Sequence, residues 1–521
     1  SGGNAYNCTL PNSDGCAATS WYNKLRTADD DDGNLANGTP HAAAIVRRNA
    51  TVSYRQLDRL LDAMARRALD GGLRAGDLVA LAFPDVLGSG AEFRYFTLSL
   101  ALARAGIATM SADAADDAIA ACFADNARNA VPAPRRVIVD DAWFAAPPDA
   151  VDVAPVPSHA DGAAICRILT TSGTTGTSKR IAISHETMMR RLSGSAVGSP
   201  YPAGPVVVVH MGPWSNIGFR HMLRALYAGG AIVLARKPDE LLRAVAQRGV
   251  NYLLLAPATL ATIVDAVPEH GGPLRGLEWV EVTGAYLPQA LYERARERLC
   301  PAIVTSYGSS EAGNTAWSLR SDLEGLPGAV GRLLPDVDVE AVDDEDRPLP
   351  PGEMGMLRVR GPGCVRGYWK DDEASAQAFR GGWFYPGDLG SVAADRMLTI
   401  AGRAQDLINV GGNKIHPRVI EEALLAVPGV ADAAAFGVPG ASGIPEVWVA
   451  LVVRGELAKK RLEETCRQLG YAAPKRIVRV TALPRNPTGK VLRGELAALA
   501  TRSTVAGGDA SDGRPRAVDA S

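Results

Sequence analysis

The sequence lacks several features that mark particular classes of protein. None of the seven cysteines forms a C-x-x-C pair, so their spacing predicts neither a zinc site nor a redox site, and we expect reduced thiols in a cytosolic protein. An excess of basic residues is also missing, because 55 basic residues nearly balance 57 acidic ones. Since a phosphate backbone attracts a basic surface, the sequence predicts no nucleic-acid partner.

Long apolar runs are absent as well. The most apolar stretches, 206–209 and 252–256, are only as long as a strand, whereas a membrane-spanning helix needs about 20 apolar residues. The first thirty residues contain Asn, Ser and Asp instead of a basic start followed by an apolar stretch. We therefore expect no membrane insertion, no secretory signal and a cytoplasmic location.

The pattern along the chain predicts an α/β protein with several parts. Residues 1–40 and 502–521 are small and polar and predict a flexible arm and a flexible tail. Helical and strand patterns alternate up to Leu299, which predicts parallel sheets covered by helices, and short strands beyond Gly328 predict a β-rich subdomain. A turn at 402–406 predicts a large N-terminal domain over 41–402 and a small α+β C-terminal domain over 403–501.

These patterns also predict individual elements. A helix is expected from the apolar spacing that follows Val52, and further helices are expected at 88–105, 239–247, 287–299 and 418–427. Strands are expected at 77–83, 106–110, 252–256, 277–282, 337–342, 355–359 and 446–453.

One loop has the composition of a phosphate-binding loop. It follows an apolar strand and supplies free backbone N–H groups, hydroxyl donors and one cation, which suit a polyphosphate. The candidate residues are Thr171, Ser172, Gly173, Thr174, Thr175, Gly176 and Lys179. The loop is not a Walker motif, because only two residues separate its glycines and Arg180 follows the lysine. The alternative is an ordinary surface loop rich in Ser, Thr and Gly.

From about Val52 to Arg493 the sequence resembles the adenylate-forming (AMP-forming) acyl- and aryl-CoA synthetases, which are related to peptide-synthetase adenylation domains and luciferases. The stretch from Val52 to Asp58 is similar to the family's T-Y-x-E-L-D, and the loop above to T-S-G-T-T-G-x-P-K-G, with Ser178 and Arg180 as departures. Five further blocks follow in family order. The resemblance implies the family's large and small domains, and ATP, Mg²⁺ and coenzyme A as cofactors or co-substrates.

Two blocks in the middle of the chain resemble the family's nucleotide-binding segments. Tyr307-Gly-Ser-Ser-Glu311 is similar to Y-G-x-T-E, which implies that Ser310 binds a phosphate oxygen and Glu311 holds Mg²⁺. A carboxylate suits such a hard cation, although an isolated glutamate there could equally cap a helix. Tyr307 is assigned to the nucleotide and Gly308 to the acid pocket. Gly284, Ala285 and Tyr286 resemble the block that passes along adenine and the acyl group.

The block from Gly382 to Leu389 is similar to G-W-[FY]-x-T-G-D-[LI], in which the Asp accepts hydrogen bonds from the ribose hydroxyls. That residue is Asp388 here, and a carboxylate can accept from both hydroxyls at once. In isolation, Pro-Gly-Asp would be a turn. Arg403 is implied as a ribose or phosphate contact, and Gln405 occupies the hinge position, where the family usually has Asp or Lys.

The last block, from Leu483 to Arg493, resembles P-x-T-x-x-G-K-x-x-R. It makes Lys490 the candidate catalytic cation, which would lie between the attacking carboxylate and the α-phosphate. Without the other blocks it would be an ordinary surface lysine.

The stretch after residue 209 occupies the place of the family's acid-binding block. Its candidate pocket residues are His210, Trp214, Ser215, Asn216 and Phe219. It lacks the Asp that would pair with an α-ammonium group, which argues against an α-amino acid, and its similarity to aryl-acid activators favours an aryl or otherwise compact acid. Core packing is the alternative for the aromatic residues.

Together these features predict an AMP-forming acid–thiol ligase that makes an acyl-adenylate from a small carboxylic acid and transfers the acyl group to a thiol. The segment after Arg493 is too short and too polar for a carrier domain, so we expect coenzyme A as acceptor, with a separate acyl carrier protein as an alternative. A non-carboxylate oxyacid substrate and a non-catalytic nucleotide- or acyl-binding protein remain further alternatives. An esterase is excluded because the sequence has no G-x-S-x-G elbow.

Overall fold

The computed structural model describes residues 42–83, 90–112, 116–129, 131–147, 155–156, 161–171, 179–198, 201–202, 204–268, 272–326, 328–410, 413–440, 445–485, 491–506 and 517–519. The predicted N-terminal arm and much of the predicted tail lie outside these residues. The chain forms two compact units, one of residues 1–196, 203–236 and 365–372 and the other of residues 197–202, 237–364 and 373–521. The predicted boundary between 402 and 403 falls inside the second unit and stays a prediction.

A six-stranded sheet in the first unit has the order β6-β5-β3-β4-β7-β8. All neighbours run parallel except β7 and β8, which form an antiparallel hairpin. The strands are β3 (Leu78–Ala82), β4 (Ala108–Ser111), β5 (Ile119–Ala124), β6 (Arg135–Ile138), β7 (Ile165–Thr171) and β8 (Lys179–Ser184). Every residue of β3 is buried, as expected of a central strand whose sequence is continuously apolar.

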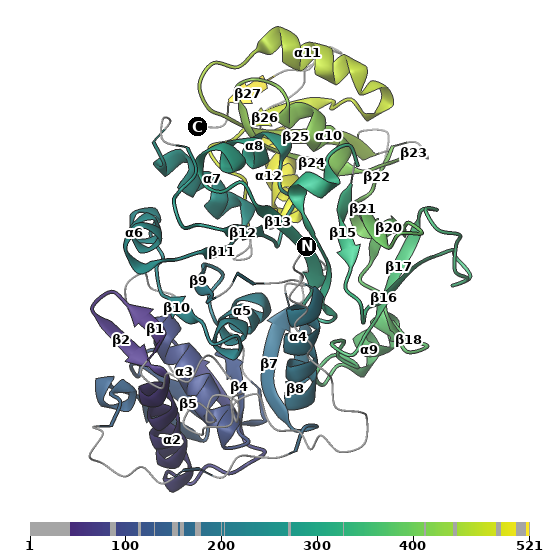
Figure 1. The fold of residues 1–521 in the computed structure, drawn as a ribbon. Coiled ribbons are helices and arrows are strands. Elements are labelled where there is room, and N and C mark those ends of the chain that lie inside the picture. The colour runs from purple at the N-terminus through teal and green to yellow at the C-terminus, as the bar shows by residue number, and fades with distance from the viewer. Residues whose placement is uncertain are drawn as a thin grey trace. The chain divides into compact units, whose positions relative to one another are not determined.

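The first unit also contains β9 (Val206–Val209), β10 (Ala231–Val233), β1 (Ala43–Arg47) and β2 (Ala50–Ser53), which pair in that order. Its long helices α2 (Tyr54–Asp70) and α3 (Ala91–Arg104) lie side by side (Figure 1). A capping box between Ser53 and Gln56 starts α2, and the helix buries residues at helical spacing. Helix α3 is buried almost all round, which explains its nearly continuous apolar sequence.

The second unit begins with a parallel sheet and continues as an antiparallel one. Strands β11 (Tyr252–Leu255), β12 (Trp279–Val282) and β13 (Ile303–Ser309) are parallel neighbours. From β13 onward, antiparallel pairing joins the neighbours β14 (Gly313–Leu319), β15 (Ala329–Leu333), β21 (Met397–Arg403), β20 (Asp388–Val392) and β17 (Gly355–Arg360). This change confirms the predicted β-rich region.

The β-rich part encloses a core of its own, formed by apolar residues such as Ala316, Leu357 and Leu398. Its strands are β14 (Gly313–Leu319), β15 (Ala329–Leu333), β16 (Asp338–Val342), β17 (Gly355–Arg360), β18 (Phe379–Arg380), β19 (Trp383–Phe384), β20 (Asp388–Val392) and β21 (Met397–Arg403).

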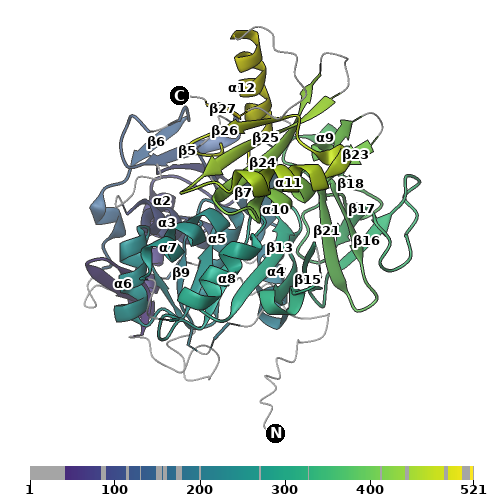
Figure 2. The ribbon, with the colours of Figure 1, turned by 90° about the horizontal axis from the view of Figure 1, so that it is seen from above.

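The C-terminal part is a sheet with helices on both faces (Figure 2). The strand order is β24 (Val430–Pro439), β25 (Pro445–Val453), β26 (Arg476–Arg479) and β27 (Ala517–Asp519), beside the hairpin of β22 (Ile408–Val410) and β23 (Asn413–Ile415). Alternate residues of β24 face opposite sides of the sheet. Ala433 and Ala435 pack toward α10 (Pro417–Leu425) and α11 (Lys459–Gln468), whereas Ala434 and Phe436 pack toward α12 (Arg493–Ala506).

The remaining helices are α4 (His185–Gly198), α5 (Asn216–Tyr227), α6 (Pro238–Arg248), α7 (Pro257–Ala266), α8 (Gln289–Arg298), α9 (Asp372–Ala378), α10 (Pro417–Leu425), α11 (Lys459–Gln468) and α12 (Arg493–Ala506). Short 3₁₀ helices are η3 (Asp141–Phe144), η4 (Arg320–Leu323), η5 (Ala404–Asp406) and η6 (Gly470–Ala472). Across the described ranges, no helix combines the length and apolar character needed to cross a bilayer. The predicted fold class, an α/β protein with a β-rich region and a small α+β part, is confirmed.

One glycine of the β-rich region is required by close backbone approach. Gly331 has a φ of 140°, and a Cβ there would lie 2.7 Å from the carbonyl carbon of Trp317 in the paired strand. We expect Gly331→Ala to lower the free energy of unfolding by about 3 kcal/mol or more, because backbone strain and a clash add. The measurement is the thermal unfolding midpoint.

The matched control is Gly352→Ala, since Gly352 also has a positive φ, of 89°, but its Cβ would meet no atom within 4 Å. That variant should lose only about 1–2 kcal/mol. Equal midpoints for the two variants would show that the approach to Trp317 does not constrain the sheet.

Candidate nucleotide and acid site

The base of the predicted phosphate loop is an antiparallel strand pair in the first unit. Thr171 at the end of β7 lies opposite Lys179 at the start of β8, and its hydroxyl donates to the Lys179 carbonyl at 3.1 Å. The Lys179 ammonium lies 4.8 Å above the ring of Tyr368. The predicted residues Ser172, Gly173, Thr174, Thr175 and Gly176 lie outside the described residues. The two described ends of the loop are therefore held at adjacent strand positions.

A buried carboxylate anchors the exit of this loop. Asp116 pairs with Arg180 and with Lys370, the latter at 2.8 Å, and accepts a hydrogen bond from the Trp369 indole at 3.3 Å. The Trp369 backbone N–H also donates to the Arg180 carbonyl at 2.7 Å. Arg180, a departure from the family motif, thus joins the loop exit to the 365–372 segment through Asp116.

The charge state of Asp116 follows from these partners. Burial alone would raise the pKa of Asp116, but the hydrogen bond from Lys370, the backbone N–H of Ala118 and the positive charge of Lys370 together lower it below its usual value. The carboxylate is therefore ionised throughout the physiological range. Lys370 itself has a φ of 54°, an uncommon conformation that its ion pairs help to hold.

The second unit brings three predicted nucleotide residues together. Asp388 on β20 lies opposite Arg403 on β21, and their side chains form an ion pair at 2.8 Å. The hydroxyl of Tyr307, at the end of β13, donates to the other carboxylate oxygen of Asp388. Arg403 also donates to the carbonyl of Pro386 at 3.1 Å. Asp388 is only 5% exposed, so the guanidinium and the phenol compensate a buried charge.

The phenol is fixed as a donor. Burial, and after it the adjacent Asp388 carboxylate, raise the pKa of Tyr307 well above its usual value. The hydroxyl therefore stays protonated and donates to Asp388, and a carboxylate can accept more than one hydrogen bond at each oxygen.

The turn after β13 carries Ser310 and Glu311 near Tyr307. Glu311 is 9% exposed and its charge acts on the Tyr307 phenol. Gly308 leaves no room for a side chain, because a Cβ there would lie 2.2 Å from the Gly313 carbonyl oxygen. Within the part of the chain that the structure describes, no three His, Cys, Asp or Glu side chains gather as a metal site. A single buried carboxylate fits Mg²⁺ when phosphate oxygens and water supply the other ligands.

The predicted adenine block follows β12. Gly284 has a φ of 87°, which permits the turn, and Thr283 donates to the Ser306 carbonyl at 3.2 Å, joining the block to β13. Tyr286 is 40% exposed, and the guanidinium of Arg418 lies 4.1 Å above its ring. Burial, with the nearby Glu422 charge, raises the pKa of Tyr286. Ala285, between them, is half-buried.

The predicted acid-pocket loop after β9 is braced by Arg236. His210 donates from Nε2 to the Arg236 carbonyl at 2.9 Å, and Arg236 returns a hydrogen bond to the His210 carbonyl at 3.0 Å. The same guanidinium lies 4.8 Å above Trp214 and pairs with Glu92 at 2.8 Å. Trp214 also packs edge-to-face on Tyr95. Trp214 is thus held from two sides.

The other pocket candidates lie at the start of α5. Ser215 is the N-cap: its hydroxyl accepts from Gly218 N–H at 2.9 Å. Asn216 accepts from Arg191 at 3.1 Å. Phe219 is buried, packing on Phe96 with the Arg167 guanidinium 3.7 Å above its ring.

The hinge candidate Gln405 is exposed and lies in η5, directly after β21. Lys490 lies outside the described residues, so its predicted role stays a prediction. The structure describes the residues on either side of its loop, up to Arg485 and from Val491.

The comparisons with known proteins identify the class. Residues 34–369 match the family model of the AMP-binding enzyme, and residues 419–490 match that of the AMP-binding enzyme C-terminal domain. The chain belongs to the AMP-binding enzyme family. It is 30% identical to a salicylyl-CoA synthase / salicylate adenylyltransferase of Streptomyces, over 86% of this chain and 89% of the relative. It is 29% identical to a feruloyl-CoA synthase of Amycolatopsis, over 88% and 96%.

Solved structures agree on the fold. ATP-bound MatB from Rhodopseudomonas palustris superimposes with a TM-score of 0.79 at 24% identity, covering 92% of this chain and 99% of that chain. The amide bond synthetase McbA from Marinactinospora thermotolerans gives 0.78 at 25% identity, over the same shares. The predicted family and enzyme class, an AMP-forming ligase, are confirmed.

Sequence reasoning missed several residues around the site. Asp116, Arg167 and Arg236 occur in no motif, and each reaches its partner across a large sequence separation. Arg167 donates to the Pro213 carbonyl at 2.9 Å while it covers Phe219. For Arg167 the sequence did offer one indication: an arginine in an otherwise apolar strand is expected to be buried, and a buried charge needs partners.

The Asp116 network generates a prediction about stability and pH. Asp116→Asn should lower the free energy of unfolding at pH 7 by about 1–3 kcal/mol, because hydrogen bonds to a charged group are lost. Since the pKa of Asp116 is below its usual value in the folded protein, its contribution is complete above about pH 4 and shrinks as the pH falls further. Thermal unfolding of both proteins at pH 7 and pH 3 measures this.

The matched control is Asp117→Asn, because Asp117 also pairs with Lys370 but its side chain is 92% exposed. That variant should unfold like the parent. If the difference in thermal unfolding midpoint between the parent and Asp116→Asn is the same at both pH values, the stabilising role assigned to the Asp116 charge is wrong.

The Asp388 site generates a second prediction. Tyr307→Phe keeps the ring but removes the hydroxyl that orients Asp388, so the KM for ATP should rise about three- to tenfold. Steady-state kinetics at varied ATP measures it. The control is Tyr292→Phe. Tyr292 lies on α8, and its hydroxyl is hydrogen-bonded to Glu324 at 3.2 Å, so this variant should leave the KM for ATP unchanged. Equal KM values for ATP in the two variants would show that Tyr307 does not orient Asp388.

Proposed function

We propose that this enzyme activates an aryl or otherwise compact carboxylic acid as its acyl-adenylate and transfers the acyl group to coenzyme A. The observation that carries the proposal is the similarity, over most of both chains, to enzymes named for aryl acids, salicylate and ferulate. A 2-succinylbenzoate–CoA ligase of Bacillus licheniformis is 26% identical over 88% of this chain. Trp214, held between Arg236 and Tyr95, supports a pocket for a flat acid.

In the proposed first step, an oxygen of the substrate carboxylate attacks the α-phosphorus of ATP, and the bond to pyrophosphate breaks. The loop from Ser172 to Gly176 and Lys179 would hold the phosphates by backbone N–H groups, hydroxyls and one cation. Lys490 would lie between the two anions and stabilise the charge that develops as they meet. Ser310 would donate to a phosphate oxygen.

The nucleotide would be oriented by the second unit. Asp388 would accept from both ribose hydroxyls, with Arg403 and Tyr307 holding its carboxylate ionised and in place. Gly284, Ala285 and Tyr286 would pass along the adenine. Mg²⁺, when bound through Glu311, would neutralise charge on the triphosphate.

In the second step the coenzyme A thiolate attacks the acyl carbon, and the bond to AMP breaks. Transfer to a separate acyl carrier protein is the alternative. A cytoplasmic location, expected from seven cysteines that form no C-x-x-C pair, remains part of the proposal.

The experiment is pyrophosphate release with Mg-ATP across aryl, short-chain and long-chain acids, with and without coenzyme A. We expect release that requires an aryl or compact acid, and a thioester when coenzyme A is present. Release without thioester would point to a carrier protein, an amine acceptor as in the amide bond synthetase relative, or a different oxyacid. Release with long-chain acids alone would contradict the substrate class.

Lys490→Ala separates catalysis from binding in the same assay. We expect acid-dependent pyrophosphate release to fall by about a hundredfold or more while ATP still binds, because one charge-stabilising group at the transition state is lost. Isothermal titration measures ATP binding. Full turnover by this variant would show that Lys490 has no catalytic role.

A further inference from the structure

Arg167 is a charged residue in the apolar first half of β7 and is only 2% exposed. Alternate residues of a strand face opposite sides of the sheet. Because Ile168 packs in the core with Leu78 and Ala80, Arg167 faces the other side. A charged side chain is almost never fully buried unless its surroundings compensate the charge. The contacts of this guanidinium therefore indicate what it is for.

The polar contacts of Arg167 lead to the predicted acid-binding loop, residues 210–219. Its Nη2 atom donates to the Pro213 carbonyl at 2.9 Å. Its Nε and Nη1 atoms have no hydrogen-bond partner among the residues that the structure describes. A single carbonyl does not neutralise a guanidinium, so the remaining compensation has to come from other groups.

Two aromatic rings supply that compensation. The Arg167 guanidinium lies 3.7 Å from the ring centre of Phe219, on α5, and 5.9 Å from that of Tyr95, on α3. Both rings are buried. The face of an aromatic ring attracts a cation, and it does so more strongly where water is excluded. The buried charge of Arg167 therefore depends on these two rings.

The same contacts connect Arg167 to Trp214. Tyr95 packs edge-to-face on Trp214, with ring centres 6.3 Å apart. We call Tyr95, Trp214 and Phe219 the aromatic wall. The second arginine at this wall, Arg236, lies over Trp214 but is paired with the Glu92 carboxylate. Arg167 is therefore the arginine whose charge is compensated by the wall itself, and it joins α3, α5 and the loop.

We propose that Arg167 is a positioning residue that fixes the aromatic wall and thereby sets the preference of the enzyme for flat acids. The inference rests on the proposed function, which assigns this loop to the acid. A guanidinium is planar, so it can stack on a ring while its edge donates to a carbonyl. Neither Met nor Lys can make both contacts. Without them the rings lose a shared contact, and a flat acid that packs on rings loses more binding than a short aliphatic acid.

The experiment measures acid-dependent pyrophosphate release by the full-length enzyme with salicylate, ferulate and propionate as probes. We expect Arg167→Met to raise the KM for the better aryl acid about tenfold, the loss expected when a desolvated cation–π contact is removed. The ratio of kcat/KM between that acid and propionate should fall by the same factor, and the KM for ATP should stay within about twofold. The unfolding midpoint should stay near that of the parent, because an apolar side chain of similar length replaces a buried charge.

Two further variants test the route of the effect. Arg167→Lys keeps the charge but cannot lie flat on Phe219, so its KM for the aryl acid should lie between those of the parent and Arg167→Met. It also carries the comparison if Arg167→Met does not fold. In the Phe219→Leu background, Arg167→Met should raise this KM by less than about twofold, because both changes remove the same contact.

The matched control is Arg358→Met. The Arg358 guanidinium lies 4.6 Å from the ring centre of Trp383 and pairs with Glu340, within the β-rich region. This variant should keep the parent's KM for the aryl acid. The parent's KM in both Arg167 variants, or a loss of kcat shared by all three acids at unchanged KM, would overturn the proposal. Pyrophosphate release by the parent that neither aryl acid stimulates would instead contradict the proposed function, so the two failures are distinguishable.

Discussion

The second unit's site depends on pairing the Asp388 carboxylate, which is almost completely removed from solvent. Such a group is costly to bury alone, and Arg403 and Tyr307 compensate it from two sides. The pairing of β20 with β21 places Asp388 directly opposite Arg403, and the end of β13 supplies the phenol. The antiparallel strands of the β-rich region therefore bring together residues that are 81 positions apart in the case of Tyr307 and Asp388.

In the first unit, a compensated buried carboxylate also holds the exit of the predicted phosphate loop. Asp116 is a buried carboxylate that carries no catalytic assignment, yet it joins Arg180 to Lys370 and Trp369. The family's glycine at residue 180 would leave Asp116 with one cation fewer. The departure at Arg180 is therefore matched by partners elsewhere in the chain, and it changes how the loop exit is held rather than the donors that the loop offers.

The sequence predicted those features that arise from short-range patterns. The buried strand at 252–255 and the helix at 238–248 follow from apolar periodicity. It could not predict that Ser215 caps α5, because a serine before a helix and a serine in a pocket have the same neighbours. Nor could it predict Arg236 beside His210, since ion pairs and cation–π contacts between distant residues leave no periodic trace.

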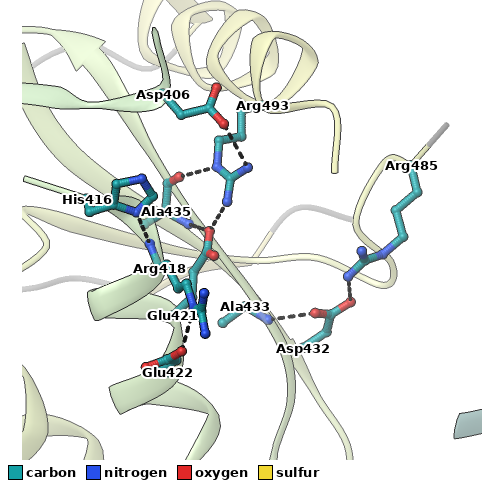
Figure 3. A network of polar contacts seen from close by, with 10 residues as sticks. All are labelled: Asp406, His416, Arg418, Glu421, Glu422, Asp432, Ala433, Ala435, Arg485 and Arg493. Carbon is teal, nitrogen blue, oxygen red and sulfur yellow. Dashed lines mark hydrogen bonds and ion pairs between the residues drawn. The ribbon is translucent and has the colours of Figure 1, made fainter. Parts of the chain in front are cut away.

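Gln405 occupies the predicted hinge position, and its surroundings suggest why an uncharged residue is suitable there. Gln405 is exposed in a single 3₁₀ turn, so rotation of the backbone there breaks no ion pair of its own. The neighbouring charge, Asp406, faces Arg493, which is held by Glu421 and the Ala435 carbonyl. A hinge at Gln405, as the sequence predicts, would therefore turn about a residue with no charge of its own, while Asp406 stays joined to α10 and β24 through Arg493 (Figure 3). The turn that would move and the ion pairs that hold the C-terminal part together involve different residues, so a rotation there would not require those ion pairs to break.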